Sequence, residues 1–338
     1  MMFELMAVNT TILITVLISA LVLTLAAAVL ILYFTICDKI FKKVFRRPRP
    51  MPQVDRSPSK IEQETIIGRG RNWFYTNRME FLNVRIKSFD GTPLCGYFRP
   101  SFDRDSRNVV ILVHGYDEHP SKMAAYAKLI MSKIQCHVII IHQRAHHMSG
   151  GKIYSYGLME SVDLDSWISF AKRQVGADAR VYLMGRSMGA TTCLLAAAQK
   201  DFSPNVVGII ADSPVANLEE AIKNKIHEEY KINPNWFIGR VRLLGIKKYG
   251  LDIRLSDCAI NASRIKVPVL IFAGTEDTVA SPEGCRRIFD NLRSAKRMVV
   301  VDRAAHLECY DKAQALYERE VQKIIERCVV RLVKMGRM

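Results

Sequence analysis

Short apolar runs alternate with segments of helical period along the chain beyond position 80. The later runs are almost continuously apolar, which is typical of strands in a parallel sheet whose two faces are both covered. The eight runs that we interpret as strands are residues 81–89, 93–100, 108–115, 136–143, 179–185, 206–213, 267–274 and 297–303. The segments that we interpret as helices are residues 121–134, 162–175, 189–200, 282–292 and 311–334. This alternation predicts one α/β sheet with right-handed crossovers.

One stretch, at about 214–262, breaks the alternation because it contains no strong strand pattern. It predicts a small helical insertion between the sixth and seventh strands, and insertions at strand ends often form lids over sites. Its apolar side chains are expected to form the core of this lid, with acyl-chain binding or contact with a bilayer as alternatives. They include Trp236, Phe237, Val241, Leu243 and Leu244.

The N-terminal segment, residues 5–37, contains no charged residue and no histidine. A spanning helix needs about 20 apolar residues, so this segment is long enough to cross a membrane. A cleaved signal peptide would have an apolar region of only about 7–15 residues after a positively charged start. Here the start carries Glu4 and neither lysine nor arginine, so the pattern favours an uncleaved transmembrane anchor.

A basic, proline-rich segment, residues 38–60, follows the anchor. Its cations are Lys39, Lys42, Lys43, Arg46, Arg47 and Arg49. Positive flanks stay on the cytoplasmic side, so we expect a single-pass protein of the cell membrane with its main domain, residues 61–338, in the cytoplasm. The cations also suit anionic headgroups. Prolines 48, 50 and 52 predict a stiff, extended linker.

The net charge bears on the partners of the protein, and the cysteine content bears on its redox compartment. The net charge of +16 would suit nucleic acid or an anionic membrane, but no nucleic-acid-binding motif accompanies it, so we expect no nucleic-acid partner. The eight cysteines form no CxxC pair. Scattered cysteines of this kind indicate small buried apolar side chains and a reducing compartment.

The strongest chemical signal is the G-x-S-x-G stretch from Gly185 to Gly189, with Ser187 at its centre. A predicted strand precedes it and a predicted helix follows it, which is the context that a nucleophile elbow requires. The two glycines remove side chains that would clash in so sharp a turn. The alternative is a serine that merely caps the helix, but a cap does not need both glycines.

A serine hydroxyl becomes a nucleophile only when a base takes its proton, and a carboxylate must then orient that base. His306 follows the last predicted strand and Asp277 follows the strand before it, so both should reach the sheet edge that carries Ser187. Asp212 and Glu276 are the rival acids, and we expect neither to reach the imidazole.

The oxyanion that forms during attack on a carbonyl needs backbone donors. The N–H of Met188, directly after the serine, is the first candidate. The N–H of Tyr116, in the loop after the third strand, is the second. His114, in the same loop, is expected to be structural and not a catalytic base.

With these motifs the sequence resembles the α/β-hydrolase superfamily, and within it the single-domain bacterial hydrolases with an N-terminal membrane segment (serine aminopeptidase-like or acylaminoacyl-peptidase-like). The resemblance covers residues 80–330 and rests on "HGYDEHP", "GRSMGA", "GTEDTVAS" and "AAHLECY". It implies a mostly parallel eight-stranded sheet flanked by helices, and hydrolysis of an ester, thioester or amide through an acyl-enzyme without a cofactor. Fold alone does not choose among these substrates.

We therefore expect a membrane-anchored serine hydrolase, of carboxylesterase or lipase-like type, that acts on a small ester or acyl substrate. A peptidase acting on short peptides is the alternative enzyme. A catalytically silent scaffold that binds partners at the membrane is the alternative of another class. The complete Ser, Asp and His set argues against the silent scaffold.

The sequence departs from the family in "HQRAHHMSGG", where the family commonly has Asp-x-Arg-Gly-His-Gly-x-Ser. His142 stands in place of the aspartate, and Ala145 and His147 stand in place of glycines. These histidines, with His146 and two more upstream, raise the possibility of a metal site. Because no HExxH or CxxC motif accompanies them, we expect loop packing and no metal.

Overall fold

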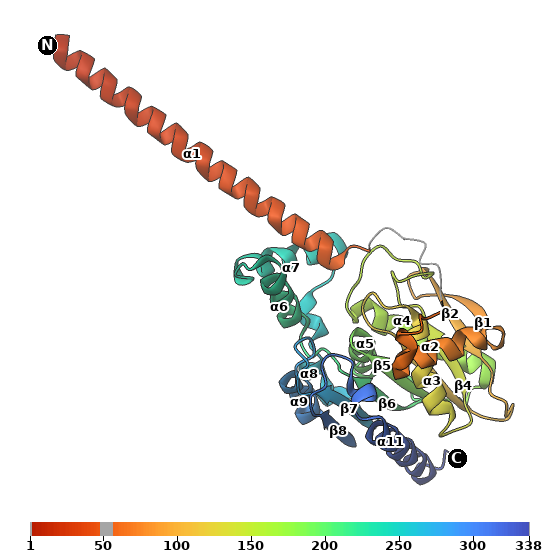
Figure 1. Cartoon of the computed structure of the whole chain (residues 1–338). Helices are drawn as coiled ribbons and strands as arrows, with labels where there is room; N and C mark the ends of the chain where they lie inside the picture. Colours follow the sequence, from red (N-terminus) through yellow and green to blue (C-terminus); the bar gives the residue numbers. More distant parts are fainter. Residues whose placement is uncertain (1, 48–56, 338) are drawn as a thin grey trace.

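The computed structural model describes residues 2–47 and 57–337, with the side chains of 2–9 and 11 left out, and it contains one eight-stranded sheet (Figure 1). The strands lie in the order β1-β2-β4-β3-β5-β6-β7-β8. Those from β4 to β8 are parallel, whereas β1 and β2 pair antiparallel at one edge. The bounds are β1 (Leu82–Lys87), β2 (Pro93–Arg99), β3 (Asn108–Val113), β4 (His137–Ile141), β5 (Arg180–Arg186), β6 (Val206–Asp212), β7 (Val269–Gly274) and β8 (Lys296–Val301). The mostly parallel eight-stranded sheet that the sequence predicts is therefore present.

Helices cover both faces of the sheet, as the apolar strands require. One face packs against α4 (Leu158–Val175), α5 (Met188–Ala197), α8 (Cys258–Asn261) and α9 (Pro282–Asn291). The other packs against α2 (Ile66–Thr76), α3 (Ala124–Met131), α10 (Cys309–Lys312) and α11 (Gln314–Lys334). Short 3-10 turns are η1 (Glu62–Glu64), η2 (Arg78–Glu80), η3 (Pro120–Met123), η4 (Ile253–Ser256) and η5 (Ala262–Arg264).

Two of these helices differ from the sequence-based expectation. The helix expected at 311–334 is interrupted at Ala313, whose φ of −137° is not helical. Helix α2 was not expected, because two glycines within eleven residues weaken a helix. Gly70 is nevertheless needed, since a Cβ there would lie 2.4 Å from the Cα of Ala125 on α3. The close packing of α2 on α3 therefore outweighs the low helix propensity.

The expected insertion between β6 and β7 is helical, with α6 (Leu218–Tyr230) and α7 (Asn235–Tyr249) as its main elements. Asn217 caps α6 by accepting a hydrogen bond from the amide of Glu220 at 3.0 Å. Lys231 and Gly250 adopt the left-handed conformation that ends a helix, after α6 and α7 respectively. The lid is therefore a helical hairpin.

The N-terminal helix α1 (Met2–Phe45) extends away from the body of the protein, and α6 and α7 lie at its base (Figure 1). It is the one helix among the described residues that is long and apolar enough to span a membrane. It does not end at Cys37, so the expectation of a linker from 38 onward is wrong for residues 38–45. Prolines 48, 50 and 52, predicted to form an extended spacer, lie outside the described residues.

The last turns of α1 pack into the lid. Buried side chains of α1, α6 and α7 form an apolar cluster separate from the two on the sheet, which we call the anchor–lid cluster. Its members are Cys37, Ile40, Phe41, Val44, Phe45, Leu218, Ile222, Ile226, Phe237, Ile238, Val241, Leu244 and Ile253. Residues 38–45, which the sequence predicts to be part of a linker, thus include buried apolar positions spaced for one helix face.

Backbone pairing also joins the end of α1 to the body. The amide of Tyr154 donates to the carbonyl of Phe45 at 2.8 Å, and the amide of Arg47 donates to the carbonyl of Lys152 at 3.0 Å. The Arg47 guanidinium donates to the carbonyl of Ser149 at 2.7 Å. The helix is therefore attached to the loop at 146–156 by a short antiparallel contact and not only by chain connectivity.

Candidate active site

Ser187 occupies the turn between β5 and α5, with φ of 50° and ψ of −122°. A Cβ on Gly185 would lie 2.3 Å from the carbonyl atoms of Gly189, and one on Gly189 would lie 2.1 Å from the carbonyl oxygen of Val113. Neither position tolerates a side chain without movement of backbone. The close approach of the turn to β3 is therefore the physical reason for both glycines.

The three side chains expected to act together are in hydrogen-bond contact. Ser187 Oγ lies 2.9 Å from His306 Nε2, and His306 Nδ1 lies 2.8 Å from Asp277 Oδ2. The other oxygen of Asp277 accepts hydrogen bonds from the amides of Val279 and Ala280 at 2.9 and 2.7 Å. An ionised carboxylate can only accept, so Nδ1 carries the proton and Nε2 is left to accept from the serine hydroxyl.

The two rival acids lie elsewhere. The carboxylate of Asp212 is fully buried and accepts hydrogen bonds from the hydroxyls of Tyr126 and Tyr317, at 3.0 and 3.1 Å. Burial raises the pKa of this carboxyl group above its ordinary value, although Arg186 opposes the shift. Glu276 is exposed. Asp277 is the one of these three acids that contacts the imidazole.

The loop after β3 lies against the serine. A Cβ on Gly115 would be 3.4 Å from the Cβ of Ser187. Within the described parts of the chain, the amide of Tyr116 donates to no acceptor. Met188 begins α5, and the first amides of a helix have no acceptor within it. Both expected oxyanion donors therefore flank Ser187, one at a helix N-terminus that favours negative charge.

A buried ion pair supports this loop, and the sequence analysis did not find it. Glu118 accepts a hydrogen bond from the amide of Gly115 at 3.0 Å and pairs with Arg186 at 3.2 Å. Burial raises the pKa of Glu118, but Arg186 and Lys122 outweigh burial and the net pKa is lowered. The available signal was an arginine at the end of an otherwise apolar strand, next to the nucleophile.

The histidines at 142–147 pack with His114 of the loop after β3, and most but not all of these rings have hydrogen-bond partners. His114 Nδ1 lies 2.7 Å from its neighbour's carbonyl at Gly115, and its Nε2 accepts from the amide of Gln143 at 3.1 Å. Burial lowers the pKa of His114 well below the usual range and that of His146 to about 3, so both rings are neutral. Neither ring nitrogen of His142 has a partner within 2–47 and 57–337. Those ranges contain no cluster of side chains suited to hold a metal ion.

The departures from the family pattern have a conformational consequence. Ala145 and His147, which stand in place of glycines, have φ of 61° and 44°. Each residue with a side chain costs about 1–2 kcal/mol in this left-handed region. The chain has kept the backbone path that glycine favours while placing side chains on it. The Arg47 guanidinium donates to the carbonyl of His147 and so helps to hold this path.

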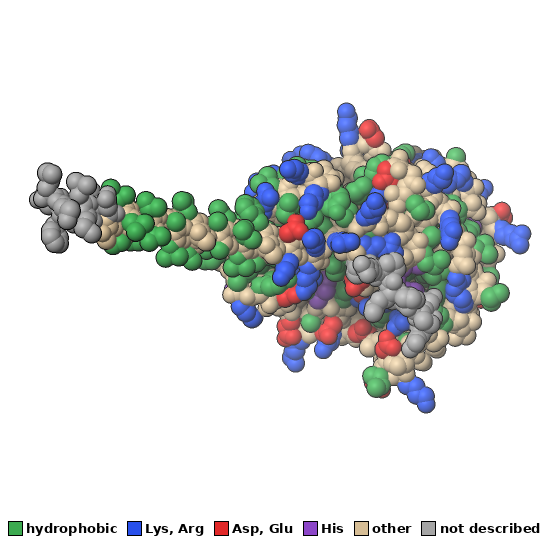
Figure 2. All heavy atoms as spheres, turned by 90° about the horizontal axis from the view of Figure 1, so that it is seen from above, with side chains coloured by type: hydrophobic (Ala, Val, Ile, Leu, Met, Phe, Trp, Pro, Cys, Tyr) green, Lys and Arg blue, Asp and Glu red, His purple; other side chains and the backbone are tan. Residues whose placement is uncertain are grey.

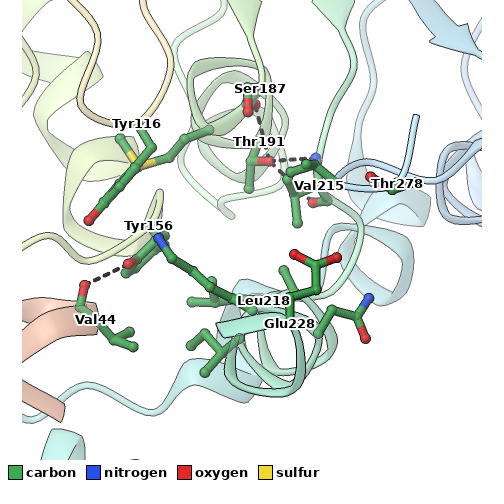
Figure 3. Close-up of a pocket in the computed structure, with 15 residues that line it drawn as sticks. Val44, Tyr116, Tyr156, Ser187, Thr191, Val215, Leu218, Glu228 and Thr278 are labelled. Atoms are coloured by element: carbon green, nitrogen blue, oxygen red, sulfur yellow. Dashed lines mark hydrogen bonds between the residues drawn. The ribbon is translucent and has the colours of Figure 1, made fainter. Parts of the chain in front are cut away.

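A cavity of about 300 Å³ opens beside Ser187, between the sheet edge and the lid (Figure 3). Figure 3 shows Tyr116 and Tyr156 on one side and Leu218 and Glu228 of α6 on the other. The hydroxyl of Tyr156 donates to the carbonyl of Val44. Among the described residues of α1, Val44 is the one that lines the cavity. The lining residues are Val44, Tyr116, Tyr156, Ser187, Met188, Thr191, Val215, Leu218, Ala221, Ile222, Asn224, Lys225, Glu228, Thr278 and Val279.

Comparison with known proteins gives a family match over residues 104–248 and 248–313, to a family described as serine aminopeptidase, S33. The protein YqkD of Bacillus subtilis, described as uncharacterized, is 28% identical over 256 residues, which is 74% of this chain and 80% of YqkD. The esterase Pf2001 of Pyrococcus furiosus has a similar structure, with a TM-score of 0.58 at 21% identity over 73% of this chain and 92% of its own. Est1E of Butyrivibrio proteoclasticus, solved with ferulic acid bound, has a TM-score of 0.56 at 18% identity over 73% and 99%.

Proposed function

Because this chain belongs to the serine aminopeptidase family of α/β hydrolases, we propose that it is a membrane-anchored serine hydrolase that cleaves a carboxylic ester or thioester through an acyl-enzyme. The observation that carries the proposal is the continuous hydrogen-bonded series from Ser187 through His306 to Asp277. The similar structure of Pf2001, which is described as an esterase, supports the choice of an ester.

In the proposed mechanism each group has a distinct role. His306 Nε2 takes the hydroxyl proton as Ser187 Oγ attacks the carbonyl carbon of the substrate. The resulting oxyanion faces the amides of Met188 and Tyr116. His306 then gives its proton to the departing alkoxide or thiolate, and the acyl group stays on the serine. A water molecule, deprotonated by the same imidazole, releases the acid. Asp277 stabilises the imidazolium in both halves.

The cavity wall favours an apolar acyl group. Leu218, Ala221 and Ile222 of α6 face Tyr156 and Val44 across the space next to Ser187. A cavity of about 300 Å³ is at the small end of the range of ligand pockets. We therefore propose a single acyl chain of moderate length as the group that enters it. Helix α1 would anchor the enzyme in the cell membrane, with the hydrolase domain in the cytoplasm.

A fluorophosphonate probe and a series of p-nitrophenyl esters of rising chain length, applied to the full chain in membranes, test this function. Ser187→Ala should abolish labelling and lower kcat by about 10⁴–10⁶, as single losses of this kind do in a serine protease. Ser132→Ala, which changes an exposed hydroxyl on the far end of α3, is the matched control and should behave as wild type.

An aminoacyl p-nitroanilide included in the same series distinguishes an esterase from a peptidase. Faster turnover of the anilide than of any ester would make the protein a peptidase. A wild-type chain that neither labels nor turns over any substrate would support the catalytically silent scaffold. Full activity in Ser187→Ala would contradict the assignment of the nucleophile.

A further inference from the structure

Helix α7 has a second apolar face, which is exposed in the described structure. We propose that this face lies in the headgroup layer of the membrane leaflet beside α1, with an anionic lipid surface as its partner. The proposal rests on the proposed anchoring of the chain by α1. It adds a second membrane contact, made by the lid itself.

The two faces of α7 are distinct. Phe237, Ile238, Val241 and Leu244 point into the anchor–lid cluster. Trp236, Leu243 and Ile246 are 69%, 54% and 38% exposed. Spacings of seven and ten residues place these three on one side of a helix. A large tryptophan and two aliphatic side chains in line are unusual on a face directed to water, but they suit the boundary between headgroups and acyl chains.

The charge on α7 fits an anionic surface. The helix contains two arginines, two lysines and no acidic residue. Arg242 pairs with Asp252 and Lys248 pairs with Asp38. Within the described ranges, Arg240 and Lys247 pair with no carboxylate, and helical spacing puts both at the edge of the exposed apolar face. Basic residues beside an apolar face are the pattern of helices that bind anionic membranes.

The position of α7 along α1 sets its depth. The exposed apolar side chains that the structure describes on α1 run from Ile12 to Phe34, a stretch of about 34 Å at about 1.5 Å per residue. This stretch is long enough to cross a hydrocarbon core of about 30 Å. Tyr33, beside Phe34 at the end of this stretch, donates a hydrogen bond to the carbonyl of Trp236 at 3.1 Å and stacks on Phe237.

Trp236 therefore lies level with the end of the membrane-spanning stretch, where tryptophan and tyrosine are enriched in membrane proteins. Arg240 lies over the ring of Phe34 at 5.0 Å, at the same level. Figure 2 shows the apolar rod of α1 entering the body of the protein, with lysine and arginine side chains gathered around its base. The lid and the anchor thus present one continuous surface to the leaflet.

Tryptophan quenching by lipid tests the proposal. The full chain is reconstituted in vesicles of phosphatidylcholine and phosphatidylglycerol whose acyl chains are brominated close to the headgroup. Trp236→Phe should remove most of the quenching, because Trp167 is buried and Trp73 is on α2 in the body. Trp73→Phe is the matched control and should leave the quenching unchanged. Arg240→Glu with Lys247→Glu should lower the quenching in these vesicles and leave it unchanged in pure phosphatidylcholine.

Extraction with alkaline carbonate separates failure of the anchoring from failure of this inference. A chain released by carbonate would contradict the proposed anchor. A chain that stays in the membrane, but whose quenching is the same in wild type and Trp236→Phe, would overturn the contact made by α7. Cross-linking of Trp236→Cys between two chains in the membrane would also overturn it, because the face would then be covered by a second copy.

Discussion

The hydrogen-bonded triad and the anchor–lid cluster lie on either side of one cavity, yet they are held together in different ways. Ser187, Asp277 and His306 each lie in the loop or turn that follows a parallel strand, so sheet topology brings them to one edge, and directional hydrogen bonds set their geometry. The anchor–lid cluster instead joins residues of α1 by apolar packing to residues about 170 to 220 positions later in the sequence. Chemistry is thus fixed by the sheet, whereas the shape of the entrance depends on how α1 packs.

The largest expected effect tests the hydrogen-bonded side of this comparison. Asp277→Asn should leave the fold intact and lower kcat by about 10⁴, because the amide would favour the wrong imidazole tautomer. Asp212→Asn should cost far less activity, since Asp212 bonds the hydroxyls of Tyr126 and Tyr317 and not His306. Glu276→Gln, at an exposed position, should be near neutral.

Steady-state kcat for the three variants, measured side by side on one ester, decides the assignment. An Asp212→Asn variant that is crippled while Asp277→Asn stays active would place the acid at the end of β6. Unfolding of each variant in denaturant reports whether a loss of kcat reflects a loss of structure.

The difference between sheet topology and packing of distant segments explains why the triad could be predicted from the sequence. Nearly continuous apolar runs identify the inner strands β3 to β7, because both faces of each are buried, whereas the edge strands β1 and β8 carry exposed polar residues. Once strand order along the chain is known, a polar residue just after a strand has a predictable location at the sheet edge. Ser187, Asp277 and His306 could therefore be proposed together without knowledge of a single contact.

Features that depend on packing between distant segments were not predictable in this way. The sequence predicts a linker at residues 38–45, because six nearby cations make this segment look polar. The helical spacing of Phe41, Val44 and Phe45, which are buried, is therefore not apparent. Helix α2 was missed since its glycines lower helix propensity, and only the close approach of Gly70 to α3 and of Gly68 to Glu62 makes them favourable. Arg186 signals a charge at the end of an apolar strand, but its pairing with Glu118 could not be inferred, because no motif indicates which carboxylate packs against it.

The next prediction tests the packing side of the comparison. Phe45 is 1% exposed, stacks on Phe41 and meets Tyr156 edge to face. Phe45→Ala should destabilise the anchor–lid cluster by about 3–5 kcal/mol, the usual cost of such a truncation in a core. Leu30→Ala, on the exposed apolar part of the same helix, is the control and should cost far less.

Amide hydrogen exchange of the solubilised full chain localises the effect of Phe45→Ala. Faster exchange should be confined to α6, α7 and the end of α1, with β5 and β7 unchanged. Equal acceleration across the sheet would show that the anchor–lid cluster and the sheet unfold as one unit, and the two regions would then not be separable.

The smallest expected effect concerns Val44, the point at which the two regions meet. Its side chain lines the cavity beside Ser187 although it belongs to α1. Val44→Ala should lower kcat/KM for long acyl esters relative to acetate by about four-fold for each of the two deleted methyl groups that contacts the acyl chain, given about 0.8 kcal/mol per buried CH₂. Ile36→Ala, which loosens the same cluster without lining the cavity, should lower stability and leave that ratio unchanged. Both variants weaken the packing of α1. A difference in the kcat/KM ratio between them would therefore report direct contact of Val44 with the acyl chain. An unchanged ratio in Val44→Ala would mean that α1 supports the lid but takes no part in binding the substrate.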